Sequence, residues 1–81
     1  MIDNIGKYIS DELRSIRSLK NKSIFDVSES TNINKDTLYK YEKDASGIKI
    51  YILDKILNYY DISIFIFFNN IYDRMQKERE K

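Results

Sequence analysis

Residues Ser23–Lys43 read SIFDVSESTNINKDTLYKYEK and contain two short predicted helices. Asp26 follows Ser23 by three residues, a spacing that resembles a capping box and predicts a helix starting after Ser23. The helical pattern stops at Thr31-Asn32, and Asn34 is a favourable N-cap for a second helix. Two helices joined by only four residues, 31–34, are typical of a helix-turn-helix.

The apolar residues of this stretch predict which sides of the two helices face a core. They recur at the three- and four-residue spacing of an α-helix. An apolar residue inside the turn should anchor both helices by packing between them. The residues expected to face the core are Phe25 or Ile24, Val27, the turn residue Ile33, Leu38 and Tyr41.

Three further helices are predicted around this motif from apolar spacing and from capping residues. The first should run from about Asn4 to Lys20, another from about Lys49 to Tyr60, and the last from after Ser63 to about Lys77. We therefore expect an all-α, five-helix domain over residues 1–75 with an extended C-terminal helix. The charged residues 76–81 should form a frayed tail.

Composition argues against an enzyme. The 81-residue chain has no Cys and no His, so disulfides, thiolate metal sites and the commonest general base are excluded. Its acidic residues do not have the spacing of a calcium-binding loop. We expect no catalytic residues, no metal, no cofactor and no small-molecule ligand.

The chain shows no targeting or membrane signal. Its first residues lack the apolar region of a signal peptide, and the most apolar run, Ile62–Phe68, is too short to cross a bilayer. Together with the absence of Cys, this predicts a cytoplasmic protein that does not associate with membranes.

Charge is the main argument against a nucleic-acid partner. The formal net charge is only +1, which is weak for a nucleic-acid binder. Residues 23–44 are net negative, so the lysines of this segment can serve DNA binding only if they share one face. The segment holds Lys35, Lys40 and Lys43 against Asp26, Glu29, Asp36, Glu42 and Asp44.

Ser23–Lys43 resembles the phage-repressor, or Xre-type (Cro/cI-like), helix-turn-helix family, whose pattern is roughly S-Q-E-E-L-A-E-K-L-G-V-S-x-S-T-I-S-R-W-E-R. Upstream, Leu13–Arg17 resembles the L/I-R-x-x-R of the family's first helix, and the resemblance extends over about residues 5–68. It implies a lambda-repressor-like fold that binds duplex DNA. The matching positions are Ser23, Glu29, Ile33, Thr37, Leu38, Lys40, Tyr41, Glu42 and Lys43.

The chain departs from the family pattern at several positions. Asn32 replaces the Gly of the turn, and Asn tolerates a left-handed backbone better than most residues. Ile24 replaces a Gln that often contacts phosphate, so that contact should be lost. Asp44 replaces a Gly and adds a negative charge near the expected DNA backbone. These changes affect the expected affinity more than the fold.

The resemblance also implies roles for individual residues. Base edges would be contacted by Lys35, Asp36, Tyr39 and Lys40, because Lys can donate to guanine and Asp can accept from cytosine. The DNA backbone would be contacted by Ser23, Thr37, Lys43 and Lys49, which position the protein without reading sequence. Arg17 and Glu42 would form a partly buried ion pair that holds the second helix of the motif at its angle.

The C-terminal helix is expected to form a dimer interface. Phe65 and Ile66 are large and apolar where the family usually carries polar residues. A helix that is apolar on more than one side must be covered. Tyr72 lies seven residues after Phe65 and continues this second apolar stripe. Asn69 lies between Phe65 and Tyr72 and is expected to form a hydrogen bond across the interface. The alternative is that these residues pack on the first helix of their own chain.

Together these features predict a transcriptional regulator that binds a palindromic operator as a homodimer and represses by occupying it. A phage repressor, a Cro-like protein and a mobile-element regulator all fit. The alternative is a protein-binding module on the same fold, such as an antitoxin or an inhibitor that grips a partner protein. The near-neutral charge favours this alternative slightly.

Overall fold

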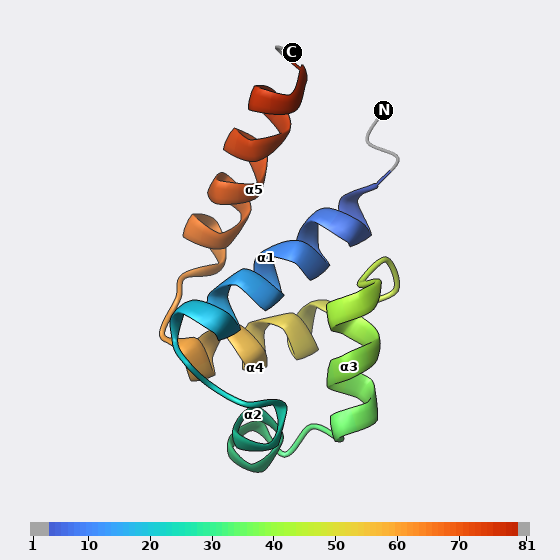
Figure 1. Ribbon diagram of the computed structural model, residues 1–81, viewed down its shortest axis with the longest axis vertical. Helices are drawn as coiled ribbons and strands as arrows, with labels where there is room; N and C mark the ends of the chain where they lie inside the picture. The colour runs from blue at the N-terminus through green and yellow to red at the C-terminus, as the bar shows by residue number, and fades with distance from the viewer. Residues whose placement is uncertain (1–3, 80–81) are drawn as a thin grey trace.

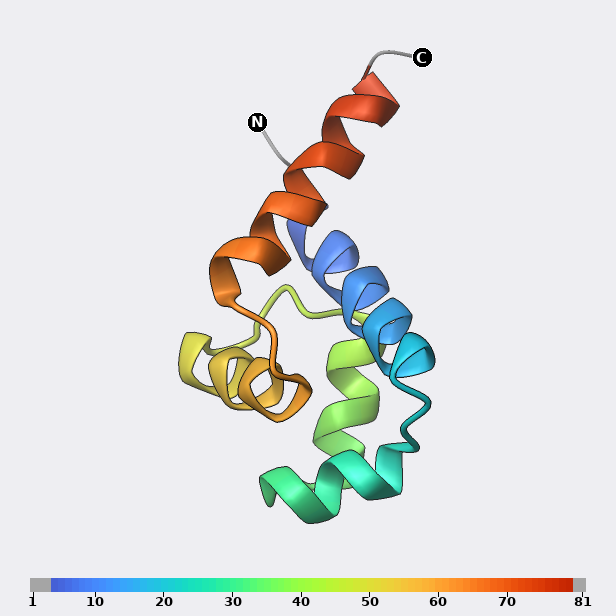
Figure 2. The same cartoon turned by 90° about the vertical axis from the view of Figure 1, so that its left-hand side faces the viewer.

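A computed structural model describes residues 4–79, and these residues fold into five α-helices without a strand (Figures 1 and 2). α1 crosses the middle of the molecule and contacts both α3 and α5, while α2 packs on α3 and α4. The all-α, five-helix fold expected from the sequence is thereby confirmed. The helices span Ile5–Leu19 (α1), Ile24–Thr31 (α2), Lys35–Lys43 (α3), Ile50–Tyr60 (α4) and Ile64–Arg79 (α5).

The helix-turn-helix begins with the capping box that the sequence predicts. Ser23 Oγ accepts a hydrogen bond from the Asp26 amide at 3.0 Å, and the Asp26 carboxylate accepts one from the Ser23 amide at 3.2 Å. Asn34 caps α3 in the same way, accepting from the Asp36 amide at 2.7 Å. These bonds satisfy amides that have no partner inside the first turn of a helix.

The turn between α2 and α3 is held by its own side chains. Asn32 ends α2 with φ 60° and ψ 28°, the left-handed conformation that its short polar side chain tolerates. Ser28 Oγ donates to the Ile33 carbonyl at 2.6 Å, and Thr31 Oγ1 accepts from the Ile33 amide at 3.3 Å. Ile33 itself is buried, as an anchor between the two helices should be.

The core settles which residue of α2 points inward. Ile24 is buried, whereas Phe25 is 57% exposed. The reason is helical geometry, because Ile24, Val27 and Thr31 follow at spacings of three and four and form one buried face. Phe25 lies about 100° further round the helix.

α5 extends further than the sequence predicts. It ends at Arg79 rather than about Lys77, so residues 76–79, which were expected to fray, are helical; Glu80 and Lys81 lie outside the described residues. Partners on α1 explain the difference. Arg74 pairs with Glu12, and the Tyr8 hydroxyl donates to the Glu78 carboxylate.

α1 touches the loop after α3 at a position that only glycine can occupy. The Gly6 carbonyl accepts a hydrogen bond from the Ala45 amide at 3.3 Å. A Cβ atom on Gly6 would lie 2.5 Å from the backbone nitrogen and Cα of Ser46. That approach is far inside van der Waals contact, so the absence of a side chain at Gly6 sets how closely the loop approaches α1.

We expect Gly6→Ala to lower the free energy of unfolding by about 1–3 kcal/mol, the usual cost of overpacking. This outcome opposes helix propensity, which favours Ala over Gly by about 1 kcal/mol. The matched control is Gly47→Ala, because nothing lies within 4 Å of an added Cβ there. Urea denaturation followed by circular dichroism checks both variants, and equal midpoints would show that the loop moves freely.

Candidate nucleic-acid interface

α3 presents one buried side and one broad exposed side. Leu38 is 2% exposed and anchors the helix in the core. The four residues expected to contact bases all lie on the exposed side. Because one residue advances an α-helix by about 100°, these side chains and that of Lys43 share one continuous arc. The exposed residues of this arc, called here the α3 face, are Lys35, Asp36, Tyr39, Lys40 and Lys43.

The α3 face carries more available positive charge than the net charge of the segment suggests. Within residues 4–79, none of its three lysines forms an ion pair. Of the acidic side chains in the segment, Glu42 pairs with Arg17, whereas Asp26 caps α2 and is itself exposed. Asp44 accepts from the Ser46 amide at 3.0 Å, and hydrogen bonding by Ser46 lowers the pKa of that carboxyl, so Asp44 keeps its negative charge beside the end of α3.

The residues expected to contact the DNA backbone differ in their exposure and in whether their polar groups are already hydrogen-bonded. Lys43 and Lys49 are exposed, at the end of α3 and immediately before α4. Thr37 is half-buried. Ser23 is exposed, but its amide and hydroxyl both bond to Asp26. A phosphate at the start of α2 would therefore meet the Asp26 carboxylate, which makes Ser23 the weakest member of this set.

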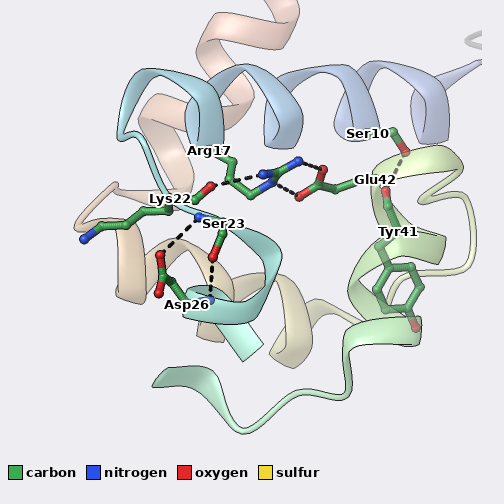
Figure 3. A network of polar contacts seen from close by, with 7 residues as sticks. All are labelled: Ser10, Arg17, Lys22, Ser23, Asp26, Tyr41 and Glu42. Atoms are coloured by element: carbon green, nitrogen blue, oxygen red, sulfur yellow. Dashed lines mark hydrogen bonds and ion pairs between the residues drawn. The ribbon is translucent and has the colours of Figure 1, made fainter. Parts of the chain in front are cut away.

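Arg17 and Glu42 form a two-pronged ion pair between α1 and α3 (Figure 3). Arg17 Nε lies 2.8 Å from Glu42 Oε2, and Arg17 Nη2 lies 3.0 Å from Glu42 Oε1. Arg17 Nη1 also donates to the Lys22 carbonyl at 3.0 Å, so one guanidinium connects α1, α3 and the loop before α2. The hydrogen bonding of Arg17 to the Glu42 carboxylate, which accepts from it, raises the pKa of Arg17.

A second polar link between α1 and α3 was not anticipated from the sequence. Ser10 Oγ donates to the Tyr41 carbonyl at 2.7 Å, and Ser10 is fully buried (Figure 3). The available signal was its position, because Ser10 sits directly beside Ile9 and one turn before Leu13 on the apolar side of α1. A small polar residue there invites a search for a buried acceptor.

The apolar stripe on α5 is uncovered in the single chain. Phe65 is 83% exposed, and Ile66 and Tyr72 are each 58% exposed. The alternative that these side chains pack on α1 of the same chain is therefore wrong. The side of α5 that faces the core is already filled by Phe67 and Ile71, which are buried. Asn69 is exposed beside the stripe.

Other kinds of site find little support in the described part of the chain. Residues 4–79 contain no cluster of three or more acidic side chains placed to hold a metal ion. Over the same residues, no helix combines the length and apolar character needed to cross a membrane.

A short turn between two capped helices, the second with an exposed cationic face, defines a helix-turn-helix DNA-binding domain. Residues 12–64 match the Cro/C1-type helix-turn-helix DNA-binding domain, and the chain belongs to this family. Members of the family bind DNA through this motif and typically have no enzymatic activity.

The fold is also similar to a crystal structure of a variant of the restriction–modification controller protein C.Esp1396I. The TM-score is 0.82, over 88% of this chain and 92% of that chain. Sequence identity is 20%, so this likeness shows the fold alone, and together with the family match it confirms the lambda-repressor-like fold expected from the sequence. No curated protein matches the sequence.

We expect Glu42→Ala to lower the free energy of unfolding by about 2–3 kcal/mol, because Arg17 would lose its partner. This is less than for a fully buried pair, since the Arg17 side chain is 27% exposed. Asp36→Ala is the control: it removes an exposed carboxylate from the same helix and should cost about 0.5 kcal/mol. Thermal unfolding checks both variants, and equal melting temperatures would contradict a structural role for the pair.

Proposed function

We propose that this DNA-binding domain regulates transcription by binding a specific duplex operator as a homodimer and by repressing through occupancy. The observation that carries the proposal is the α3 face, whose exposed lysines are free of ion pairs within residues 4–79. The similar solved structure belongs to a protein named as a controller, which supports a regulatory role here.

The α3 face suits direct readout of a major groove. Lys35 and Lys40 would donate to guanine O6 or N7, and Asp36 would accept from cytosine N4. Tyr39 would complete the base-contacting set. Lys43, Lys49, Thr37 and, more weakly, Ser23 would contact the DNA backbone.

Dimerisation is proposed to occur through the exposed stripe of α5. Burying Phe65 and Ile66 would contribute roughly 1.5–3 kcal/mol each, with Tyr72 and Asn69 beside them. A two-fold protein requires a two-fold site, so the operator would be palindromic. Its half-site centres would lie about 34 Å apart or at a multiple of that distance.

The second candidate is a protein-binding module on the same fold, an antitoxin or an inhibitor. The observations that favour it are the net charge of +1 and the same apolar stripe. Salt dependence separates the two candidates. Affinity for a DNA partner falls steeply as salt rises, because bound phosphates release counterions, whereas affinity for an apolar protein interface does not.

We expect Lys35→Ala and Lys40→Ala each to weaken binding to a selected operator by roughly 1–3 kcal/mol without unfolding the domain. The operator would be selected from a random duplex library by the wild-type protein. The control is Lys77→Ala, on the part of α5 that lies farthest from α3 (Figure 1). If both α3 variants bind like the wild type, the α3 face does not read DNA.

We expect Phe65→Glu combined with Ile66→Lys to give a folded monomer with lower operator affinity, measured by analytical ultracentrifugation and DNA titration. Two charges cannot be buried at an apolar interface without a large desolvation cost.

The matched control for this double variant is Ile50→Lys with Tyr51→Glu, which alters two exposed apolar residues of α4, each 63% exposed. The control should dimerise like the wild type. A wild-type protein that stays monomeric at high micromolar concentration, or an α5 variant that still dimerises, would rule out this interface.

A further inference from the structure

An exposed aromatic ring lies beside the first residue of α3. Phe25 is the second residue of α2 and is 57% exposed. Lys35 Nζ lies 5.8 Å from the centroid of its ring, within the range of a cation–π contact. Tyr39 follows Lys35 by one turn on the same side of α3 and is 58% exposed. These three residues form an aromatic edge of the α3 face.

The fold does not account for Phe25. The buried side of α2 is supplied by Ile24, Val27 and Thr31, and the ring of Phe25 points to the other side. Its contact with Lys35 lies at the surface, where a cation–π pair stabilises a protein only slightly. A large apolar side chain is thus held at the surface without a structural function.

The position of the ring gives it access to DNA. In helix-turn-helix proteins, the N-terminal residues of the second helix of the motif contact the base edges. Lys35 is the first residue of α3, and its ammonium group lies over the ring of Phe25. The base next to the one contacted by Lys35 would therefore lie against Phe25.

We propose that Phe25 is a specificity-determining residue that recognises the C5 methyl group of a thymine next to the base contacted by Lys35. The inference rests on the proposed function. A phenyl ring has no hydrogen-bonding group, so it cannot read the donors and acceptors of the groove or bind a phosphate. The thymine methyl is the apolar group that base edges present in the major groove.

The same ring also restricts Lys35. A lysine ammonium is a flexible and strongly hydrated point charge, which by itself discriminates poorly between acceptors. With Phe25 on one side of this ammonium group, Lys35 would donate preferentially on the other sides. Phe25 and Lys35 together would favour a thymine beside a guanine.

Deoxyuridine scanning tests this proposal, because deoxyuridine lacks only the methyl group of thymidine. Each thymidine of the selected operator is replaced in turn, and affinity is measured for the wild type and for Phe25→Ala. At one thymidine per half-site, the wild type should lose about fourfold in affinity, as expected for one buried methyl group. Phe25→Ala should bind the thymidine and the deoxyuridine forms of the operator equally well at that position.

Two further variants complete the experiment. Phe25→Leu keeps an apolar side chain and should retain most of the thymidine preference. Tyr51→Ala removes an exposed aromatic residue of α4 and should show the wild-type profile. Circular dichroism verifies that each variant is folded.

The possible failures are distinguishable. If Phe25→Ala weakens binding but leaves the deoxyuridine profile unchanged, the ring contacts the sugar–phosphate backbone and the proposal is wrong. If the wild type and Phe25→Ala have the same affinity for the operator and for each of its deoxyuridine forms, Phe25 has no part in recognition. If the wild type selects no duplex at all, the proposed function fails, and this inference fails with it.

Discussion

Polar contacts with α1 hold α3 in place together with its one buried apolar side chain. Leu38 is the one fully buried side chain of this nine-residue helix. Its C-terminal half is held by the ion pair of Glu42 with Arg17 and by the bond from Ser10 to the Tyr41 carbonyl. Within the described residues, every buried side-chain nitrogen or oxygen has a hydrogen-bond partner. Such satisfied networks fix one geometry, because each alternative leaves a buried group unpaired.

Local chemistry made much of the fold predictable. Ser23 and Asn34 mark the starts of α2 and α3 by capping, and Asn32 supplies the left-handed residue of the turn. Phe25 and Ile24 could not be separated by pattern, because α2 has only eight residues and its inward side is decided by contact with other helices. The end of α5 was likewise hidden from local reasoning, since its polar partners lie on α1, more than 60 residues away in sequence.

The candidate site was predictable in its location more than in its chemistry. The exposed side of α3 follows from helical periodicity once Leu38 is placed inside. Net charge was a poor guide, because it does not distinguish a carboxylate that is paired with an arginine, such as Glu42, from one that is unpaired. Glu42 is paired with Arg17, whereas within residues 4–79 the lysines of the α3 face form no ion pair. Base identity depends on geometry with DNA, and a sequence does not contain that geometry.

The pairing of α1 with α5 brings the start of one helix and the end of the other to the same half of the molecule, away from α2 and the start of α3 (Figures 1 and 2). A fluorophore or an affinity handle attached to the last turn of α5 would therefore project away from the surface proposed to meet DNA, whereas the start of α1 lies beside Lys43 at the end of α3. The end of α5 is thus suited to carrying an attached group, because it lies far from α2 and from the α3 face.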